Sequence, residues 1–454
     1  MYHAETIKEK LRLFMVILVP ILITQLSYFG MNLIDTIMSG RAGTDDLAGV
    51  AIGANLWMPV FTAVNGILLA ITPIISQQLG AGEGKRIAGT ITQGLYLGVL
   101  FGVLVITLGA AALSPALSFM SLEPGVERIA AHYLIGLAFG IIPFFLSIVL
   151  RNFFDAQGHT RITMVIMLGT LPFNAFFNYV LIFGKFGFPE LGGIGAGYAT
   201  AISYWIIFAF SIMMTFRIPA MRRFRIFLDW YKPSWQAWKE QLRIGVPMGM
   251  SLFFESSIFS AVSLLMASLF STVTVAAHQV ALSFTSLIFM VPLSISIALT
   301  IVVAFEVGGG YLEGAKAYTR LGVAAAMGIL GVASIGIFLL REPIAYIYTT
   351  NEEVVKLAAQ FFLFAIVYQI SDAAQASLQG VLRGYKDVTV PFFTALVSYW
   401  ALGLPAGYLL AVTTPLGPFG LWLGITVGLT SAAIGFFIRL KIVVQRHARG
   451  HGVS

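Results

Sequence analysis

Three acidic residues lie within long apolar stretches of the sequence, where a charge is costly. They are Asp35 in GMNLIDTIMSG, Glu255 in SLFFESSIFS and Asp372 in YQISDAAQAS. A carboxylate at the centre of a bilayer costs at least about 2.5 kcal/mol if it faces lipid, so we expect each acid to face a bundle interior or a water-filled cavity. None has a Lys or Arg close to it in its own stretch. Unpaired acids in a cavity suit the binding of a proton or a small monovalent cation, held weakly enough for release.

The same acids also have a structural interpretation. Protonated carboxyl groups can hydrogen-bond neighbouring helices, and an acid near the end of a membrane span can be reached by water. This interpretation is stronger for Asp35, which lies closer to the expected outer end of its stretch, than for Glu255 or Asp372.

Other polar and aromatic side chains accompany the acids. Asn174 and Asn178 are four residues apart and therefore share one helix face. With Asp35 they would line a polar pocket, although hydrogen bonding to a neighbouring helix explains them equally well. Tyr368 lies one turn before Asp372 and could hydrogen-bond to a ligand that Asp372 binds.

Phenylalanine is abundant, with 37 residues. Phe253, Phe254 and Phe289 fall on the first two apolar stretches of the second half, near Glu255. Aromatic faces beside an acid attract hydrophobic cations through burial and cation–π contact, so we expect Phe289 to contribute to substrate binding. Most of the phenylalanines must still pack against other helices or face lipid.

Helices that cross a membrane must position these residues. The chain is 58% hydrophobic and 10% charged, whereas a soluble protein has about 25% charged residues. A span needs about 20 apolar residues, and the sequence has twelve such stretches: 13–38, 47–75, 90–113, 129–150, 162–183, 193–216, 245–270, 275–304, 321–340, 354–380, 388–411 and 417–440. We therefore predict an all-α polytopic membrane protein with twelve transmembrane helices.

The two halves of the chain are similar to each other. A shift of about 228 residues brings Pro20 close to Pro247 and the Gly80 loop onto the Gly308 loop. Six spans in each half give both repeats the same orientation, so a pseudo-twofold axis along the membrane normal relates two six-helix lobes. We predict an N-terminal lobe at 1–216, a basic cytoplasmic linker at 217–243 and a C-terminal lobe at 244–454, with the substrate path between the lobes.

Lysine and arginine predict the orientation. The net charge is +7, and most basic residues fall in alternating connections that include both termini. Because positive residues remain on the cytoplasmic side, both termini are expected in the cytoplasm. The opposite connections hold only Arg41, Arg128, Lys185, Arg341 and Lys356.

The sequence contains no enzyme signature. Cysteine is absent, and the six histidines form no H-E-x-x-H pair. The segment GAGEGKR from Gly80 lacks the spacing and the hydroxyl of a phosphate-binding loop. The residues therefore predict no cofactor and no enzymatic activity, and a transporter without an ATP site must use an ion gradient.

Several segments together resemble the multidrug and toxic compound extrusion (MATE) family, in its NorM branch. They follow in the order typical of that family over essentially the whole chain: MNLIDTIMSG (31–40), FGKFGFPELGGIGAGYATAISYW (183–205), FFESSIFS (253–260), VAAHQVALSFTSLIFMVP (275–292), YQISDAAQ (368–375) and LRGYKDVTVP (382–391). The resemblance implies two six-helix lobes that form a V.

The resemblance also implies export of cationic, amphipathic drugs and dyes by antiport with Na+ or H+, by alternating access. It places one cation site at Glu255, Tyr368 and Asp372, with Na+ held by the two acids, and a polar site at Asp35, Asn174 and Asn178. Asp35, Glu255, Phe289 and Asp372 are the residues expected to bind substrate.

We therefore expect a monomeric, multi-pass protein of the cell membrane whose partners are cationic compounds, the coupling cation and lipid, with no nucleic acid. Export of a lipid-linked precursor is the alternative function. It requires a strongly basic cavity, and few Lys or Arg residues lie within the spans.

Overall fold

The structure is a computed structural model that describes residues 1–450, so the last four residues of the expected C-terminal lobe (244–454), including His451, lie outside the described part. Within the described residues, the chain is helical and has no strand. Among residues 1–450, eleven helices are long and apolar enough to cross a membrane, and a bent pair of shorter helices raises the number to twelve. The prediction of an all-α polytopic membrane protein is confirmed.

The chain divides into two compact units. Unit 1 comprises Met1 and Val19–Gly249, and unit 2 comprises Tyr2–Leu18 and the residues from Met250 onward. The division falls inside α1 (Ile7–Ala42) and α10 (Trp235–Leu269), not in the expected linker 217–243. Each of these two helices therefore begins in one unit and ends in the other.

The segment expected as a linker packs on unit 1 because side chains of α4 (Ile87–Phe119) bind its backbone. The Tyr96 hydroxyl donates to the carbonyl oxygen of Tyr231 at 2.6 Å, and Gln93 donates to that of Lys232 at 2.7 Å. The Trp238 indole donates back to Gln93 at 2.8 Å. These hydrogen bonds satisfy the backbone carbonyl groups of Tyr231 and Lys232 and hold the segment against α4 of unit 1.

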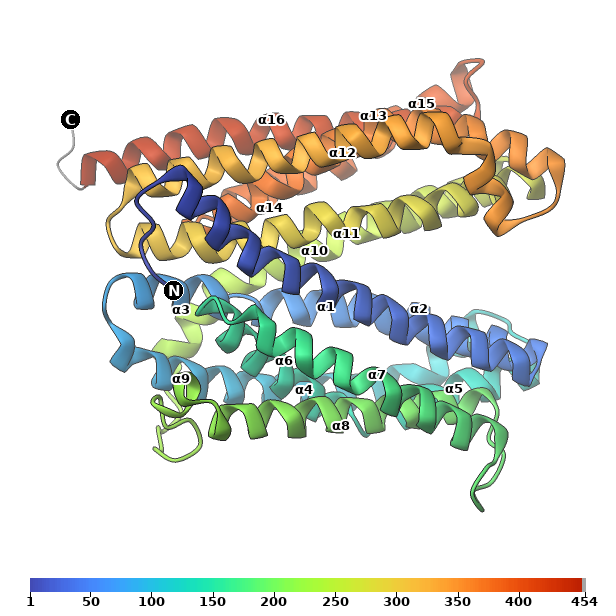
Figure 1. The fold of residues 1–454 in the computed structure, drawn as a ribbon. Coiled ribbons are helices and arrows are strands. Elements are labelled where there is room, and N and C mark those ends of the chain that lie inside the picture. Colours follow the sequence, from blue (N-terminus) through green and yellow to red (C-terminus); the bar gives the residue numbers. More distant parts are fainter. Residues whose placement is uncertain (451–454) are drawn as a thin grey trace. The chain divides into compact units, whose positions relative to one another are not determined.

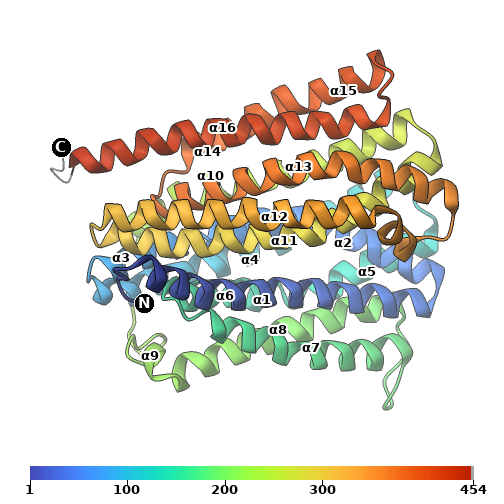
Figure 2. The same cartoon turned by 45° about the horizontal axis from the view of Figure 1, so that its top comes forward.

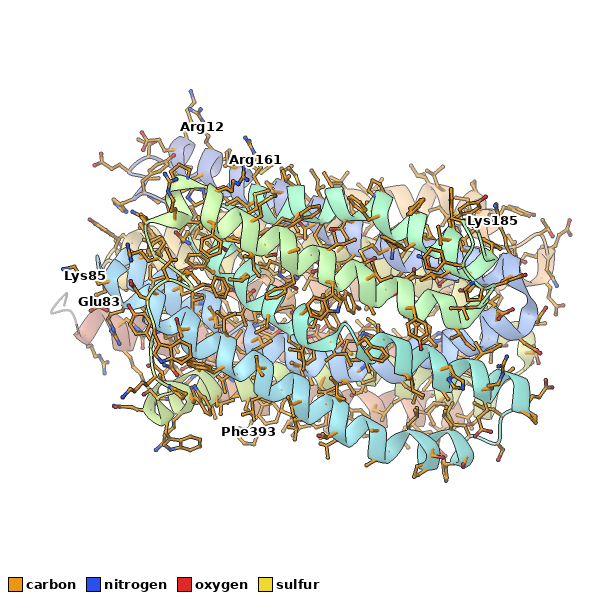
Figure 3. All side chains as sticks on the ribbon, turned by 90° about the horizontal axis from the view of Figure 1, so that it is seen from below. Arg12, Glu83, Lys85, Arg161, Lys185 and Phe393 are labelled. Atoms are coloured by element: carbon orange, nitrogen blue, oxygen red, sulfur yellow. The ribbon has the colours of Figure 1, made fainter. Side chains whose placement is uncertain are left out.

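Unit 1 contains the following further elements: α2 (Thr44–Leu68), α3 (Ile71–Gly80), η1 (Gly84–Arg86), α5 (Pro124–Ala138), α6 (Ile141–Ala156), α7 (Thr160–Phe183), α8 (Gly193–Arg217) and α9 (Pro219–Arg222). The bent pair is α5 and α6, which meet at 53°. Helix α8 packs against α5, α6 and α7 (Figure 1). Figure 3 shows Glu83, Lys85 and Arg161 towards one end of unit 1 and Lys185 at the opposite end.

Unit 2 contains the following further elements: α11 (Thr272–Gly308), α12 (Leu312–Tyr348), α13 (Glu352–Gly384), α14 (Thr389–Leu396), η2 (Val397–Gly403), α15 (Leu404–Thr413) and α16 (Pro418–Gly450). Helix α13 lies along α11, α12 and α16 (Figures 1 and 2), which makes it the central helix of this unit. Its start is fixed by Asn351, whose side chain accepts the backbone N–H of Glu353.

The π-helix η2 interrupts the span made by α14, η2 and α15. Short π-helical turns within α-helices are rare and often mark functional sites. Close packing against α16 holds this span, since a Cβ atom on Gly424 would lie 2.3 Å from the Cα atom of Gly407 on α15. Only glycine at this crossing allows the two backbones to approach so closely.

Two turns of the first half have counterparts of the same local geometry in the second half. Gly82 and Gly310 have φ values of 74° and 78°, and the same pattern of backbone hydrogen bonds surrounds each. Gly192 and Gly417, before α8 and α16, also form a pair, with φ values of 62° and 58°. Because a positive φ suits glycine, the repeated glycines mark the same two turns in each half.

Candidate functional site

The polar site of unit 1 is built around Asp35 on α1. This side chain is buried, with 6% exposure. Its Oδ1 atom accepts a hydrogen bond from Asn178 Nδ2 at 2.6 Å, and its Oδ2 atom accepts one from Thr200 Oγ1 at 2.9 Å. No basic side chain among residues 1–450 forms an ion pair with Asp35. The acid is therefore held by neutral donors alone.

The two asparagines of α7 extend this site. Both are fully buried, and Asn178 Nδ2 also contacts the side-chain oxygen of Asn174 at 3.2 Å. Asn174 in turn donates to Ser203 Oγ on α8 at 3.1 Å. The Oδ1 atom of Asn178 is buried without a hydrogen-bond partner among the described residues. A buried acceptor without a donor is costly, so this oxygen is available to a cation or a proton donor.

The polar site of unit 2 joins α10 to α13. Glu255 and Asp372 are 8% and 4% exposed, and Gln375 is fully buried. The Gln375 side-chain nitrogen donates to Glu255 Oε1 at 2.9 Å and to Asp372 Oδ1 at 2.8 Å. Two acids from two helices therefore meet at one amide group, and neither forms an ion pair among the described residues.

The π-helix η2 completes this site from a third element. The Tyr399 hydroxyl donates to Gln375 Oε1 at 2.8 Å, and the Trp400 indole donates to the carbonyl oxygen of Phe254 at 3.2 Å. Phe254 precedes Glu255 on α10. Adjacent residues of η2 thus reach both helices that carry the acids.

Tyr368 lies one turn before Asp372 on α13, beside Thr285 of α11. Its ring packs edge-on against Trp422 of α16, with 5.7 Å between ring centroids. Trp422 donates to His278 Nδ1 at 2.9 Å. This Nδ1 atom accepts, so a neutral His278 carries its proton on Nε2, which lies 2.9 Å from Ser263 Oγ. The chain of contacts fixes the ring of Tyr368 next to the acid.

Phe289 lies half-buried on α11, one turn after Thr285 and on the same helix face. Within residues 1–450 it forms no aromatic stacking or cation–π contact. The structure therefore shows no aromatic or cation–π contact that connects Phe289 to Glu255 or Asp372 among these residues. Its role in substrate binding stays a prediction.

Arg383 is a buried basic residue of unit 2, 3% exposed, on α13 beyond Gln375. It acts electrostatically on Glu255 and on Tyr399. Its Nη2 atom has no hydrogen-bond partner among the described residues. This arginine thus offsets part of the negative charge of Glu255.

Both sites offer oxygen donors from carboxylate, amide and hydroxyl groups. Such ligands suit hard cations. Within the described residues, no group of three or more His, Cys, Asp or Glu side chains is arranged to hold a metal ion. Hydrogen bonds satisfy both N–H groups of Gln375, whereas the buried Oδ1 atom of Asn178 has no hydrogen-bond partner among the described residues.

Gln375, Thr200 and Tyr399 are among the residues of these sites that the sequence analysis does not predict. Gln375 follows Asp372 by three positions, and this spacing on a helix could have revealed it. Thr200 and Tyr399 lie on other elements than their partners, and no local spacing connects them to Asp35 or Gln375.

Comparisons with known proteins show the family to which the chain belongs. A family model described as MatE matches residues 20–180 and 247–409. The chain is 52% identical over 455 residues to "Probable multidrug resistance protein NorM" of Halalkalibacterium halodurans, with 100% of this chain and 99% of the relative covered. It is 45% identical to the Bacillus subtilis protein of the same name, with 99% of each chain covered.

Solved structures share the fold. The eukaryotic MATE transporter AtDTX14 has a TM-score of 0.85 at 22% identity, with 98% of each chain covered. A MATE crystal structure in the bent conformation has a TM-score of 0.90 at 19% identity, with 99% of this chain and 98% of the other covered. Identities this low establish similarity of fold alone.

Proposed function

Since the chain belongs to the MatE family and is a multidrug efflux transporter, we propose that it exports cationic, amphipathic compounds in exchange for Na+, with H+ as the alternative coupling ion. Its relatives are named as multidrug resistance proteins, not as enzymes. The export activity follows from the family, while the ion and the charge of the substrates are the proposal.

One observation carries this proposal. Glu255 and Asp372, on different helices, direct oxygens at the same buried nitrogen atom of Gln375. A cation in that position would be attracted by both acids, with the amide and hydroxyl groups around it as further ligands. Two acids so close together repel each other when both are charged, and a bound cation relieves the repulsion.

Coupling follows from charge. A cationic drug and the coupling cation are both attracted by the same acids, so the binding of one lowers the affinity for the other. The Asp35 site of unit 1 offers the same chemistry, with the partnerless Asn178 oxygen as a further ligand. Competition between the drug and the coupling cation for the acids is sufficient for exchange if the drug binds from one side of the membrane and the coupling cation from the other.

We also propose that the protein lies in the cell membrane with both termini in the cytoplasm. In unit 1, Lys85 and Arg161 lie towards the end opposite Lys185 (Figure 3). In unit 2, His3 and Ala448 line the same pocket, so the N-terminal segment and the end of α16 share one end of this unit. Most basic residues of the sequence fall in the connections that alternate with the two termini. Because basic residues favour the cytoplasmic side of a membrane, this distribution supports a cytoplasmic position of the termini.

The test is efflux of ethidium from proteoliposomes that contain the purified protein, with Na+ and pH gradients imposed separately. We expect efflux that depends on the Na+ gradient and that Asp372→Asn abolishes. Glu313→Gln is the matched control, because Glu313 is an exposed acid of the same unit. Efflux driven only by the pH gradient would assign the coupling to H+. No efflux of a cationic dye under either gradient would overturn the proposed function.

A further inference from the structure

The amide group of Gln375 has only one orientation that suits the hydrogen bonds around it. Its two N–H groups serve two carboxylates, and its oxygen accepts from the Tyr399 hydroxyl. The reverse orientation would place the amide oxygen against two acids and lose both charge-assisted hydrogen bonds. Two ionised acids therefore favour the present orientation over the reverse.

A cation between the acids reverses this preference. Na+ is coordinated by oxygen and repelled by N–H groups, and a protonated carboxyl group becomes a donor that needs an acceptor. A half-turn about the last side-chain bond of Gln375 would present Oε1 to the ion and place the NH2 group against Tyr399. A tyrosine hydroxyl donates or accepts, so Tyr399 can bond the amide in either orientation.

We propose that the Gln375 amide is an occupancy switch for the cation site of unit 2, an inference that rests on the proposed cation antiport. In the empty site its NH2 group holds Glu255 and Asp372. When a cation binds, the amide turns, its carbonyl oxygen becomes a ligand, and the Tyr399 hydroxyl changes from donor to acceptor. Gln375 thus positions the side chains of the two acids, and its orientation changes the hydrogen bond to Tyr399 of η2 when a cation binds.

The surroundings show how the change would reach the helices. Tyr399 and Trp400 lie in the π-helix, where Trp400 also holds the α10 backbone at Phe254. On its other side, the glycines of α15 and α16 pack backbone against backbone. A change of hydrogen bonding at Tyr399 therefore acts on a segment that connects α10, α13 and α16.

The charged groups at this point are Glu255, Asp372 and Arg383. Arg383 acts electrostatically on Glu255 from the same helix as Gln375. It keeps its charge at all relevant pH values. The switch therefore responds to a cation that neutralises one of the two acids, because the charge of the arginine is constant.

The test is infrared difference spectroscopy of the full-length protein with 13C-labelled glutamine, with Na+ or low pH compared against K+ at neutral pH, alongside 22Na+ binding. We expect a cation-induced shift of one glutamine carbonyl band that Gln375→Met removes. The matched control is Gln379→Met, one turn further along α13, where Gln379 makes no hydrogen bond to either acid among the described residues. This control should keep the band shift.

Tyr399→Phe tests the same switch with Gln375 intact, in case Gln375→Met does not fold. The labelled carbonyl band of the empty site should move to higher frequency because its donor is removed. Cation binding without any band that depends on Gln375 or Tyr399 would overturn the switch alone. No cation binding by the wild type would overturn the proposed function and the switch with it.

Discussion

Asp372→Asn should weaken binding of the coupling cation by about 30- to 1,000-fold. Asp372 and Glu255 lie 2.8 Å and 2.9 Å from the same nitrogen atom. An ion in that region therefore has both acids as close neighbours. A unit charge about 4 Å away contributes about 4 kcal/mol at an effective dielectric constant of about 20. The asparagine that replaces Asp372 keeps a dipole, so the expected loss is about 2 to 4 kcal/mol, and each 1.4 kcal/mol is about tenfold in affinity.

The assay is equilibrium binding of 22Na+ to purified protein, at constant ionic strength maintained with choline, for the wild type, Asp372→Asn and Glu313→Gln. Glu313 is exposed and pairs with Lys316 at 3.0 Å, so its variant should bind like the wild type. Glu255→Gln should lose about as much affinity as Asp372→Asn, because both acids meet at one point. The double variant should lose less than the sum of the two, as expected for neighbouring groups.

A folded Asp372→Asn protein with wild-type affinity for both Na+ and protons would refute this reasoning. Folding is checked by size-exclusion elution and by intrinsic fluorescence. An equal loss in Glu313→Gln would also count against it, because the effect would then come from net charge and not from the site.

Three further predictions concern stability, each measured as the apparent unfolding temperature of the detergent-solubilised protein. Thr200→Val removes one of the two donors to buried Asp35 and should cost about 1 to 3 kcal/mol; an unchanged unfolding temperature would mean that water replaces the hydroxyl. Trp422→Phe leaves the Nδ1 atom of buried His278 without its donor and should cost about the same, and a more stable variant would contradict the assigned tautomer. Gly424→Ala places a methyl group 2.3 Å from the backbone of α15, so it should lower the unfolding temperature by several degrees or prevent folding, whereas a neutral effect would contradict the close helix crossing.

The membrane helices were predictable because the bilayer requires long apolar stretches whose backbone groups bond internally. Each expected span coincides with one helix or with consecutive shorter helices, and many helices are longer than their apolar stretch. Helix α10 begins at Trp235, whereas the apolar stretch begins at 245. Helices extend into the polar interface, where composition no longer marks their ends.

The candidate sites were predictable only in part. The spacing of Asn174 and Asn178 placed both on one face, and the structure brings Asn178 to Asp35. Thr200, by contrast, approaches from a helix whose position depends on packing across the whole unit. The spacing of residues along the sequence predicts which side chains share a face of one helix. It does not predict which faces of different helices pack together to form a site.

The π-helix could not be predicted from VSYWALG, because the segment is apolar and fits an ordinary helix equally well. Its geometry depends on packing against α16, where glycines allow close approach. The role of Tyr399 follows from this geometry, and the sequence pattern gives no sign of it.

The most direct test of the account is the affinity of the purified protein for ethidium, measured by fluorescence at increasing Na+ and at several pH values. Competition for the same acids predicts that the apparent Kd for ethidium rises with Na+ or with proton concentration, and that ethidium lowers 22Na+ binding by the same factor. An ethidium Kd that is independent of both ions would contradict it.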